Sequence, residues 1–478
     1  LSKKRRNMQL GSLAIVVGTV LLEMVCGVPY ATTRYGKLQG FNYEMKTGTE
    51  AKVFLGIPYA LPPTGDLRYE PTRSIRPWKG TEKMKTFGPS CFPHDKNALT
   101  RDLQYSEICL SLNVMAPLRK SVEEDGYPVI VYIHGGGFEI GSSASFDYKN
   151  LCDTFVSRGI VFVTFNYRVG FLGFLTTGDN AMPGNAGLWD QVQALTYIKE
   201  NIAAFGGDPE RITIMGHSAG GASVGALSLS PHSNYLFQQT ISLSGSPFNE
   251  FARSETTVDD SLDLIRAVGC HKEHSKLSKE CMKQKSIVEL FNGVDKIGPG
   301  RAIESGIKFH PHFDESFFPK PLEQLLKEAP HKPSLVGVTN SEAAIYVFFE
   351  SKIMWHMDIS PSKASTFSAN DLIEYIKEKI APEEEFGSAA KQFQRQLIEF
   401  FVERDVPSNA GREFYLSRAV DLVSDIVFNM GIYYEVTSKA AQKWPTYFFV
   451  QDYHHTDPKL PYQGILQSSF RIRPFQSH

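Results

Sequence analysis

Residues Arg211 to Ser230 read "RITIMGHSAGGASVGALSLS" and carry the clearest structural pattern in the chain. Its apolar run leads into Gly216, and Ser218 lies between that glycine and Gly220, ahead of a run of small residues. The apolar run predicts a strand, and the small residues are typical of a helix packed closely against a sheet. In a nucleophile elbow the serine sits on a strained strand-to-helix turn, where flanking glycines let neighbouring backbone approach. The stretch therefore predicts Ser218 as a nucleophile, with a purely structural turn as the alternative.

A second glycine cluster follows a strand-like run in "VIVYIHGGGFEIGS", Val129 to Ser142. Backbone N–H groups after such a run are free to converge on a carbonyl oxygen, as they do in an oxyanion hole. A phosphate-binding loop is the rival interpretation. The segment contains neither Gly-x-Gly-x-x-Gly nor the Lys-Ser/Thr pair of a P-loop, so the pattern favours the oxyanion site.

Six short apolar runs, bounded by Gly, Pro or polar turns, predict strands at residues 129–133, 160–165, 211–215, 239–243, 334–338 and 446–450. They are nearly continuous rather than alternating, as expected for strands buried on both faces of a parallel sheet. Residues 187–205 carry one apolar face at helical spacing. The sequence predicts an α/β fold with a mostly parallel central sheet and helices on both faces. Residues 248–318 and 370–403 are expected as insertions over one edge.

The composition is that of an ordinary globular protein, with 42% apolar and 21% charged residues among 478. Such a chain can bury a sizeable core, and its length allows one large domain or two to three smaller ones. The formal net charge of −2 provides no long-range field to attract a polyanion. We therefore expect no nucleic-acid partner.

The N-terminus reads "LSKKRRNMQLGSLAIVVGTVLLEMVCGVPYA". A basic cluster precedes an apolar stretch with small residues near Gly27, which is the pattern of a secretory signal. A membrane anchor is the alternative, because the stretch approaches the roughly 20 residues needed to span a bilayer. Glu23 within it favours the signal. We expect residues 1–27 to be a signal peptide, residues 28–478 to be one domain, and the protein to be secreted or lumenal.

The cysteines fit an oxidising compartment. Two pairs flank polar loops, Cys91 with Cys109 and Cys270 with Cys281, and short loops between cysteines of a secreted chain are plausible disulfides. Zinc is the alternative, but neither pair has the two-residue spacing of a zinc ligand pair. We therefore expect no metal, with Cys26 lost in the signal and Cys152 a buried free thiol.

Several ordered motifs then carry a family resemblance. They are "FLGIPYALPPTGDLRYEP", "SEICLSLNV", "IHGGGFEIGS", "FNYRVGFLGFLTTGD", "PGNAGLWDQVQALTYIKENIAAFGGDPERITIMGHSAGGASV" and "ISLSGS". Together they resemble the type B carboxylesterases, the cholinesterase-like branch of the α/β-hydrolases, from about Thr32 to Gly464.

The resemblance implies ester hydrolysis through an acyl-enzyme, without a cofactor. It makes Ser218 the nucleophile and the backbone N–H groups of Gly136, Gly137 and Ala219 the oxyanion hole. It also pairs Cys91 with Cys109 and Cys270 with Cys281. His217 replaces the glutamate usual at that position. Because it adjoins Ser218 on a sharp turn, we expect His217 to point elsewhere and not to act as the base.

The family's catalytic acid is a glutamate just after a strand, and "SLVGVTNSEAAIYVFF" places Glu342 there. A carboxylate at a strand end can fix the tautomer of an imidazole and stabilise its cation. The sequence therefore predicts Glu342 as the acid. A solvated turn residue is the alternative.

The base is harder to find, because the order Ser, acid, His requires a histidine after Glu342. Those available are His356, His454, His455 and His478. The first follows the acid too closely, and the next two sit at the end of the last predicted strand. Gapless alignment with the family motif puts Gln467 at the position of the histidine.

Glutamine has no useful basicity near neutral pH, so Gln467 cannot accept the serine proton. Three explanations stay open. The C-terminus is incorrect or alternatively spliced, the chain is impaired, or His454 or His455 substitutes. The chain also ends without the family's C-terminal helical segment, so the 28–478 domain is expected to be C-terminally truncated.

These inferences predict a secreted serine carboxylesterase that acts on small carboxylic esters. The competing hypothesis is a non-catalytic adhesion or binding protein of the same fold. Ser218, Glu342 and the glycine donors favour the enzyme, and Gln467 favours the alternative. A cholinesterase is disfavoured, because the loop between Cys91 and Cys109 lacks a Trp as a platform for choline.

Overall fold

The computed structural model describes residues 27–298, 300, 306–344, 359, 361–452 and the backbone of 471–474. The signal peptide expected over residues 1–27 lies outside these residues, apart from Gly27.

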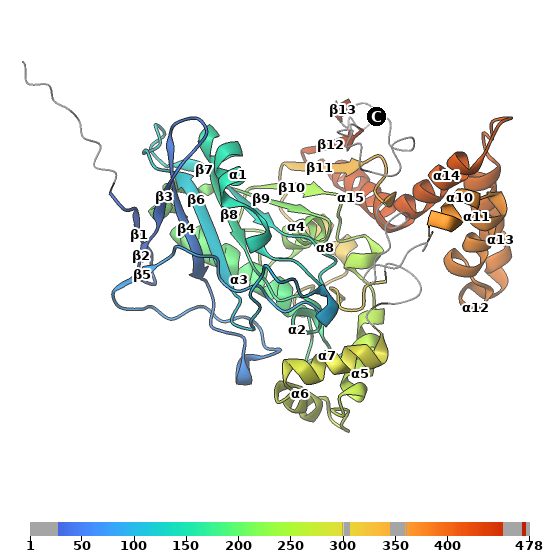
Figure 1. The fold of residues 1–478 in the computed structure, drawn as a ribbon, viewed down its shortest axis with the longest axis horizontal. Helices are drawn as coiled ribbons and strands as arrows, with labels where there is room; N and C mark the ends of the chain where they lie inside the picture. The colour runs from blue at the N-terminus through green and yellow to red at the C-terminus, as the bar shows by residue number, and fades with distance from the viewer. Residues whose placement is uncertain are drawn as a thin grey trace, which may run out of the picture.

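A ten-stranded sheet forms the centre of the described chain, in the order β13-β12-β11-β10-β9-β7-β8-β6-β4-β3 (Figure 1). Its strands are β3 (Phe41–Glu44), β4 (Glu50–Pro58), β6 (Ser111–Pro117), β7 (Tyr127–Ile133), β8 (Val161–Phe165), β9 (Gly207–His217), β10 (Gln239–Leu243), β11 (Ser334–Thr339), β12 (Thr446–Gln451) and β13 (Arg471–Pro474). A small second sheet holds β1 (Tyr30–Thr32), β2 (Lys37–Gln39) and β5 (Thr81–Lys83).

The middle of the large sheet is parallel. Strands β8, β7, β9, β10, β11 and β12 pair in parallel, in that order. These are the six strands expected from the apolar runs, so the α/β prediction with a mostly parallel sheet is confirmed. The carboxyl ends of parallel strands lie along one edge, where Leu243 is opposite both His217 and Gly337.

The antiparallel strands at the two edges of the sheet were not predicted. Strand β6 pairs antiparallel with β8, β4 with β6, and β3 with β4, while β13 pairs antiparallel with β12. Strand β6 is buried along its whole length although it contains polar residues such as Asn113. The Asn113 amide donates to Ser143 Oγ and Thr164 Oγ1, and its oxygen accepts from the Gly56 N–H. Internal hydrogen bonding therefore allows this burial.

Helices cover both faces of the sheet, as expected. On β8 the side chains of Val161, Val163 and Phe165 belong to the main core, whereas Phe162 packs with Cys152 in a second core. Cys152 lies on α1 (Tyr148–Thr154). The main core contains the apolar residues of α3 (Ala186–Asn201) and α4 (Ala219–Leu229). Alternate strand residues thus face different helices.

The other α-helices within the described residues are α2 (Gly170–Phe174), α5 (Thr256–Ala267), α6 (Ser275–Lys283), α7 (Ile287–Ile297), α8 (Leu322–Glu328), α10 (Pro361–Thr366), α11 (Ala369–Tyr375), α12 (Glu383–Phe386), α13 (Ala390–Ile398), α14 (Arg412–Ser424) and α15 (Met430–Ala441). The two insertions were expected over one edge. Figure 1 instead shows two separate groups, α5–α7 at the bottom and α10–α14 at the right.

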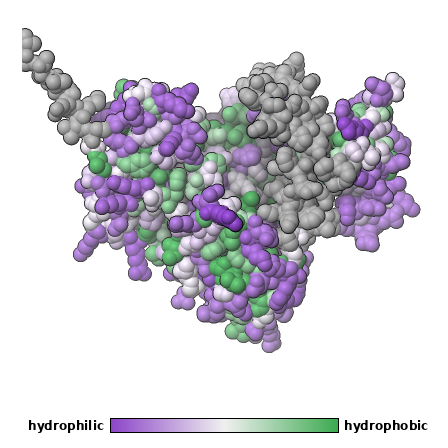
Figure 2. All heavy atoms as spheres, viewed as in Figure 1, coloured by the Kyte–Doolittle hydropathy of each residue, from purple (hydrophilic) through white to green (hydrophobic). Residues whose placement is uncertain are grey.

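The space-filling view is mainly hydrophilic over the right-hand group, whereas apolar residues reach the surface in patches towards the bottom (Figure 2). Among the described helices, none is both long enough and apolar enough to cross a bilayer.

A buried ion pair ties α3 to the segment after β8. Asp190 of α3 is fully buried and accepts hydrogen bonds from Arg168 Nε and Nη2, each at 2.8 Å. The Arg168 backbone N–H donates to the same carboxylate at 2.9 Å. Removing one partner of such a pair leaves an uncompensated charge in the core.

We predict that Asp190→Ala lowers the free energy of unfolding by about 3–5 kcal/mol, because Arg168 then stays buried without its counter-ion. Chemical denaturation measures the loss. Asp263→Ala is the matched control, since it breaks an exposed Arg266–Asp263 pair at 2.8 Å and should cost about 1 kcal/mol or less. Equal losses in the two variants would contradict the prediction.

Candidate active site

The turn between β9 and α4 places Ser218 at its apex. Ser218 has φ 58° and ψ −126°, a backbone conformation that side-chain-bearing residues rarely adopt. Its N–H donates to the Leu243 carbonyl at 2.8 Å, and its carbonyl accepts from the Ala222 N–H at 2.9 Å. The serine is therefore held on a strained strand-to-helix turn, the geometry expected of a nucleophile elbow.

Two glycines make this turn possible. A Cβ at Gly216 would clash with the backbone of Gly220, and a Cβ at Gly220 would clash with the backbone at Ile133, the end of β7. The turn is thus packed backbone against backbone on both sides of Ser218.

The glycine loop after β7 lies directly against the elbow. A Cβ built on Gly135 would come within 3.1 Å of Ser218 Cβ, so the loop and the serine are neighbours. Gly136 has φ 117° and Gly137 φ 62°, which turn their peptide groups away from a regular strand. Neither of their N–H groups has a hydrogen-bond partner in the part of the chain that is described.

A third free donor comes from α4. Ala219 is the first residue of this helix, and the first N–H groups of a helix have no acceptor inside it. The structure thus brings the predicted donors Gly136, Gly137 and Ala219 to the same place as Ser218. Free amides beside a serine can stabilise negative charge on a carbonyl oxygen.

The Glu139 side chain ties the glycine loop to the backbone at Lys308 and Phe309. This role was not expected from the sequence. The buried Glu139 carboxylate accepts from the backbone N–H groups of Lys308 at 2.9 Å and Phe309 at 3.3 Å, and lies 3.5 Å from His94 Nδ1. Burial raises the pKa of Glu139, with His94 acting in the opposite direction. In the sequence, the sign of this role is that Glu139 is a carboxylate between the apolar residues Phe138 and Ile140, directly after the three glycines.

Glu342 lies at the same edge of the sheet, three residues after β11. Its Oε1 accepts from Ser244 Oγ at 2.7 Å and from the Thr339 N–H at 2.6 Å. Burial raises the pKa of Glu342, although these two hydrogen bonds partly offset the effect. The carboxylate is therefore fixed in place.

Ser244 connects the acid to the elbow. It follows β10 with φ 52°, and the next residue, Gly245, packs against the Ser218 carbonyl so closely that a Cβ there would clash. No role for Ser244 was expected from the sequence. The sign of one is the "SGS" segment, residues 244–246, directly after the strand predicted at 239–243.

The histidines considered as the base, His356, His454, His455 and His478, lie outside the described residues, as does Gln467. The described chain reaches Asp452, whose carboxylate accepts from the Asn340 side chain at 2.9 Å. The side chain of His217 is exposed and forms no hydrogen bond to Ser218 or to any other described residue. The proposed site thus contains a serine, free amides and a carboxylate, with its base unassigned.

Both expected disulfides are present. Cys91–Cys109 and Cys270–Cys281 are bonded, and Cys152 is a buried free thiol. No group of three or more His, Cys, Asp or Glu side chains is placed to hold a metal ion within the described ranges.

We predict that Gly216→Ala lowers the free energy of unfolding by about 1–3 kcal/mol, because the added methyl group overpacks a site walled by backbone. Chemical denaturation tests it. Gly411→Ala is the control, since its Cβ meets nothing closer than 4.0 Å and should cost about 1 kcal/mol or less at the helix N-terminus. A Gly216→Ala protein as stable as the parent would show that the elbow accommodates the methyl group, and would contradict the prediction.

The model of the protein family described as "Carboxylesterase family" matches residues 28–471 of this chain. Gut esterase 1 of Caenorhabditis briggsae is 34% identical over 445 residues, which cover 93% of this chain and 77% of that protein. The medium-chain fatty acyl-CoA hydrolase precursor of Anas platyrhynchos is 37% identical over 329 residues, 66% of this chain and 57% of its own. Neuroligin-2 of Mus musculus is 34% identical over 358 residues, 67% and 42% of the two chains. The chain therefore belongs to the carboxylesterase family and has the α/β-hydrolase fold that this membership implies.

Proposed function

We propose that this protein is a serine carboxylesterase that hydrolyses small carboxylic esters through an acyl-enzyme. The observation that carries the proposal is the meeting of Ser218, on its strained turn, with the glycine loop that packs against it. Similarity to proteins named as esterases and hydrolases supports the same reading.

In this mechanism Ser218 Oγ attacks the ester carbonyl carbon. The carbonyl oxygen becomes an oxyanion, and the N–H groups of Gly136, Gly137 and Ala219 donate to it. Collapse of the tetrahedral intermediate breaks the bond to the alcohol oxygen, which leaves as the alcohol, and Ser218 keeps the acyl group. Water then attacks the acyl-enzyme and releases the carboxylic acid.

A base oriented by Glu342 must carry the proton of Ser218 Oγ to the leaving alcohol oxygen, and later a proton of the attacking water back to Ser218 Oγ. The hydrogen bonds from Ser244 and Thr339 fix this carboxylate, which would stabilise an imidazolium at the same edge of the sheet. His454 and His455 follow Asp452 in the sequence, close after β12, which pairs in parallel with β11. Gln467 stands where the family motif has its histidine.

We predict that a fluorophosphonate ester forms one covalent adduct per chain, on Ser218, because phosphorus mimics the tetrahedral carbon that the free amides would stabilise. Peptide mapping by mass spectrometry locates the adduct. Ser218→Ala should lose it, while Ser275→Ala, on α6 of the bottom helix group, should keep it. Failure to label both the parent and Gln467→His, or an adduct that persists in Ser218→Ala, would contradict the proposed nucleophile.

We predict that Gln467→His raises kcat on a small aryl ester by at least about 10²-fold, because a triad without its base loses on the order of 10⁶ in turnover. The control is the double variant His454→Gln/His455→Gln, which should leave the parental rate unchanged. A fast parent enzyme that the double variant inactivates would instead assign the base to one of these two histidines.

A non-catalytic binding protein of the same fold is the second candidate function. The similarity to neuroligin-2, whose name is not that of an esterase, favours it. The labelling experiment separates the two candidates, since a binding protein has no need of a reactive Ser218.

We also propose that the protein acts in the secretory pathway or outside the cell. The basic-then-apolar N-terminus and the two disulfides support this location, because disulfides persist in oxidising compartments.

A further inference from the structure

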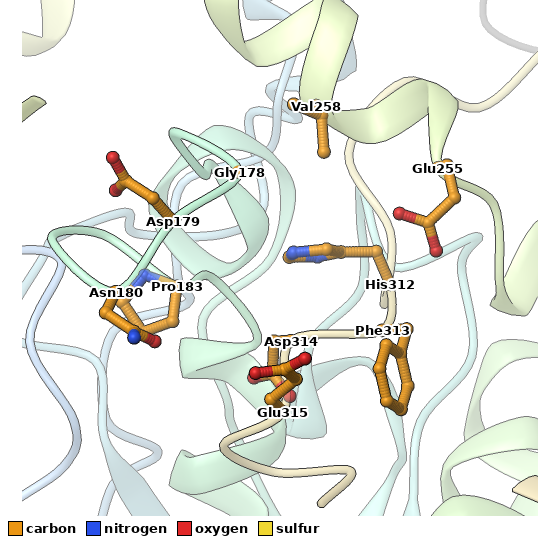
Figure 3. Close-up of a pocket in the computed structure, with 10 residues that line it drawn as sticks. All are labelled: Gly178, Asp179, Asn180, Pro183, Glu255, Val258, His312, Phe313, Asp314 and Glu315. Atoms are coloured by element: carbon orange, nitrogen blue, oxygen red, sulfur yellow. The ribbon is translucent and has the colours of Figure 1, made fainter. Parts of the chain in front are cut away.

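An acidic cavity lies between the loop after α2 and the start of α5. It has a volume of about 320 Å³ and is lined by ten residues (Figure 3). Four of them are carboxylates, Asp179, Glu255, Asp314 and Glu315, and none is a lysine or an arginine. These residues are distinct from the elbow, the glycine loop and Glu342.

His312 provides an independent sign that the cavity receives a ligand. Its imidazole projects into the middle of the cavity in Figure 3, yet the residue is only 3% exposed. Its Nδ1 is buried with no hydrogen-bond partner among the residues described. Burial lowers the pKa of His312 to about 4, so the ring is neutral at pH 7 and one of its nitrogens accepts a hydrogen bond. Buried polar groups left without a partner call for one.

The cavity is therefore rich in acceptors and poor in positive charge. The carboxylate of Asp314 is buried, and its Oδ1 already accepts from the N–H groups of residues 316, 317 and 318. Glu255, Glu315 and Asp179 are exposed at the rim. A ligand that carries hydrogen-bond donors and a positive charge complements this arrangement.

The spacing of the carboxylates also favours an organic cation over a metal ion as the ligand. Within the described chain no three His, Cys, Asp or Glu side chains are close enough to share one metal ion. The rim carboxylates are thus spread around a space of molecular size. An ammonium group gains from the combined negative potential of such carboxylates without forming a hydrogen bond to each of them.

A second cavity beside the first indicates the chemistry of the part of the ligand that carries no charge. It has about 210 Å³, shares Glu255, His312 and Phe313 with the first, and is otherwise lined mainly by apolar side chains. Its one cation, Arg253, is already paired with Glu323 at 3.2 Å. Phe313 lies between the two spaces, where an aromatic ring can contact both a cation and an apolar group.

We propose that these two adjacent cavities form a binding site for a primary ammonium that carries an apolar arm. The ammonium group lies near Glu255 and Glu315 beside His312, and the arm extends past Phe313 into the second cavity. The site is separate from the proposed esterase chemistry and does not depend on it.

Phenethylammonium is a suitable probe, and 2-phenylethanol is its neutral counterpart of nearly the same shape. Ligand-observed NMR on the full chain, carried out with Ser218→Ala to remove any reaction at the elbow, should show the amine binding at least about tenfold more tightly. The difference should shrink as salt is added, because exposed charges are screened.

The double variant Glu255→Gln/Glu315→Gln should weaken amine binding by about tenfold and leave the alcohol unaffected. Asp263→Asn/Glu280→Gln is the charge-matched control, since both residues are exposed on α5 and α6 and neither lines either cavity. It should change amine binding by less than twofold.

Three results would overturn the proposal. The amine binds no better than the alcohol, the two double variants weaken it equally, or the amine does not bind at all. In the last case water fills the cavity and supplies the partner of His312.

Discussion

The close backbone packing around Ser218 is the constraint on which the rest of the site depends. The loop after β7, the end of β9, the start of α4 and the residue after Ser244 all approach the same turn, and each does so at a glycine. A methyl group at any of these points would push two main chains apart. The position of the serine is therefore set by main-chain atoms of several segments, which is a stiffer arrangement than side chains alone provide.

The register of the parallel strands places the other residues of the site at the same edge of the sheet as this turn. Because Leu243 lies opposite both His217 and Gly337, the residues that follow β9, β10 and β11 emerge at one level. Ser218, Ser244 and Glu342 all come from these positions, and the hydrogen bond from Ser244 to Glu342 spans neighbouring strand ends. Open α/β sheets place ligands outside the carboxyl ends of their strands for this reason.

The local sequence was sufficient to predict the parallel strands. Continuous runs of Val, Ile and Phe indicate burial on both faces, whichever segments pack against them. The local sequence was not sufficient for β4 and β6. Their polar residues, such as Asn113, become acceptable only once Ser143 and Thr164 supply partners from elsewhere in the chain. The same limit explains Glu139. Its lone carboxylate was visible, but its partners His94 and Lys308 come from segments that only the fold brings together.

The distribution of backbone strain bears on the choice between an enzyme and a binding protein. Phe138, Ser218 and Ser244 all have positive φ, at 59°, 58° and 52°, and they follow the neighbouring strands β7, β9 and β10 in the chain. Each such residue costs on the order of 1–3 kcal/mol and persists only where its surroundings impose it. A nucleophile exposed beside free amides requires such a strained turn. The described framework therefore favours catalysis at Ser218. The source of the base affects the rate of proton transfer and leaves this backbone framework unchanged.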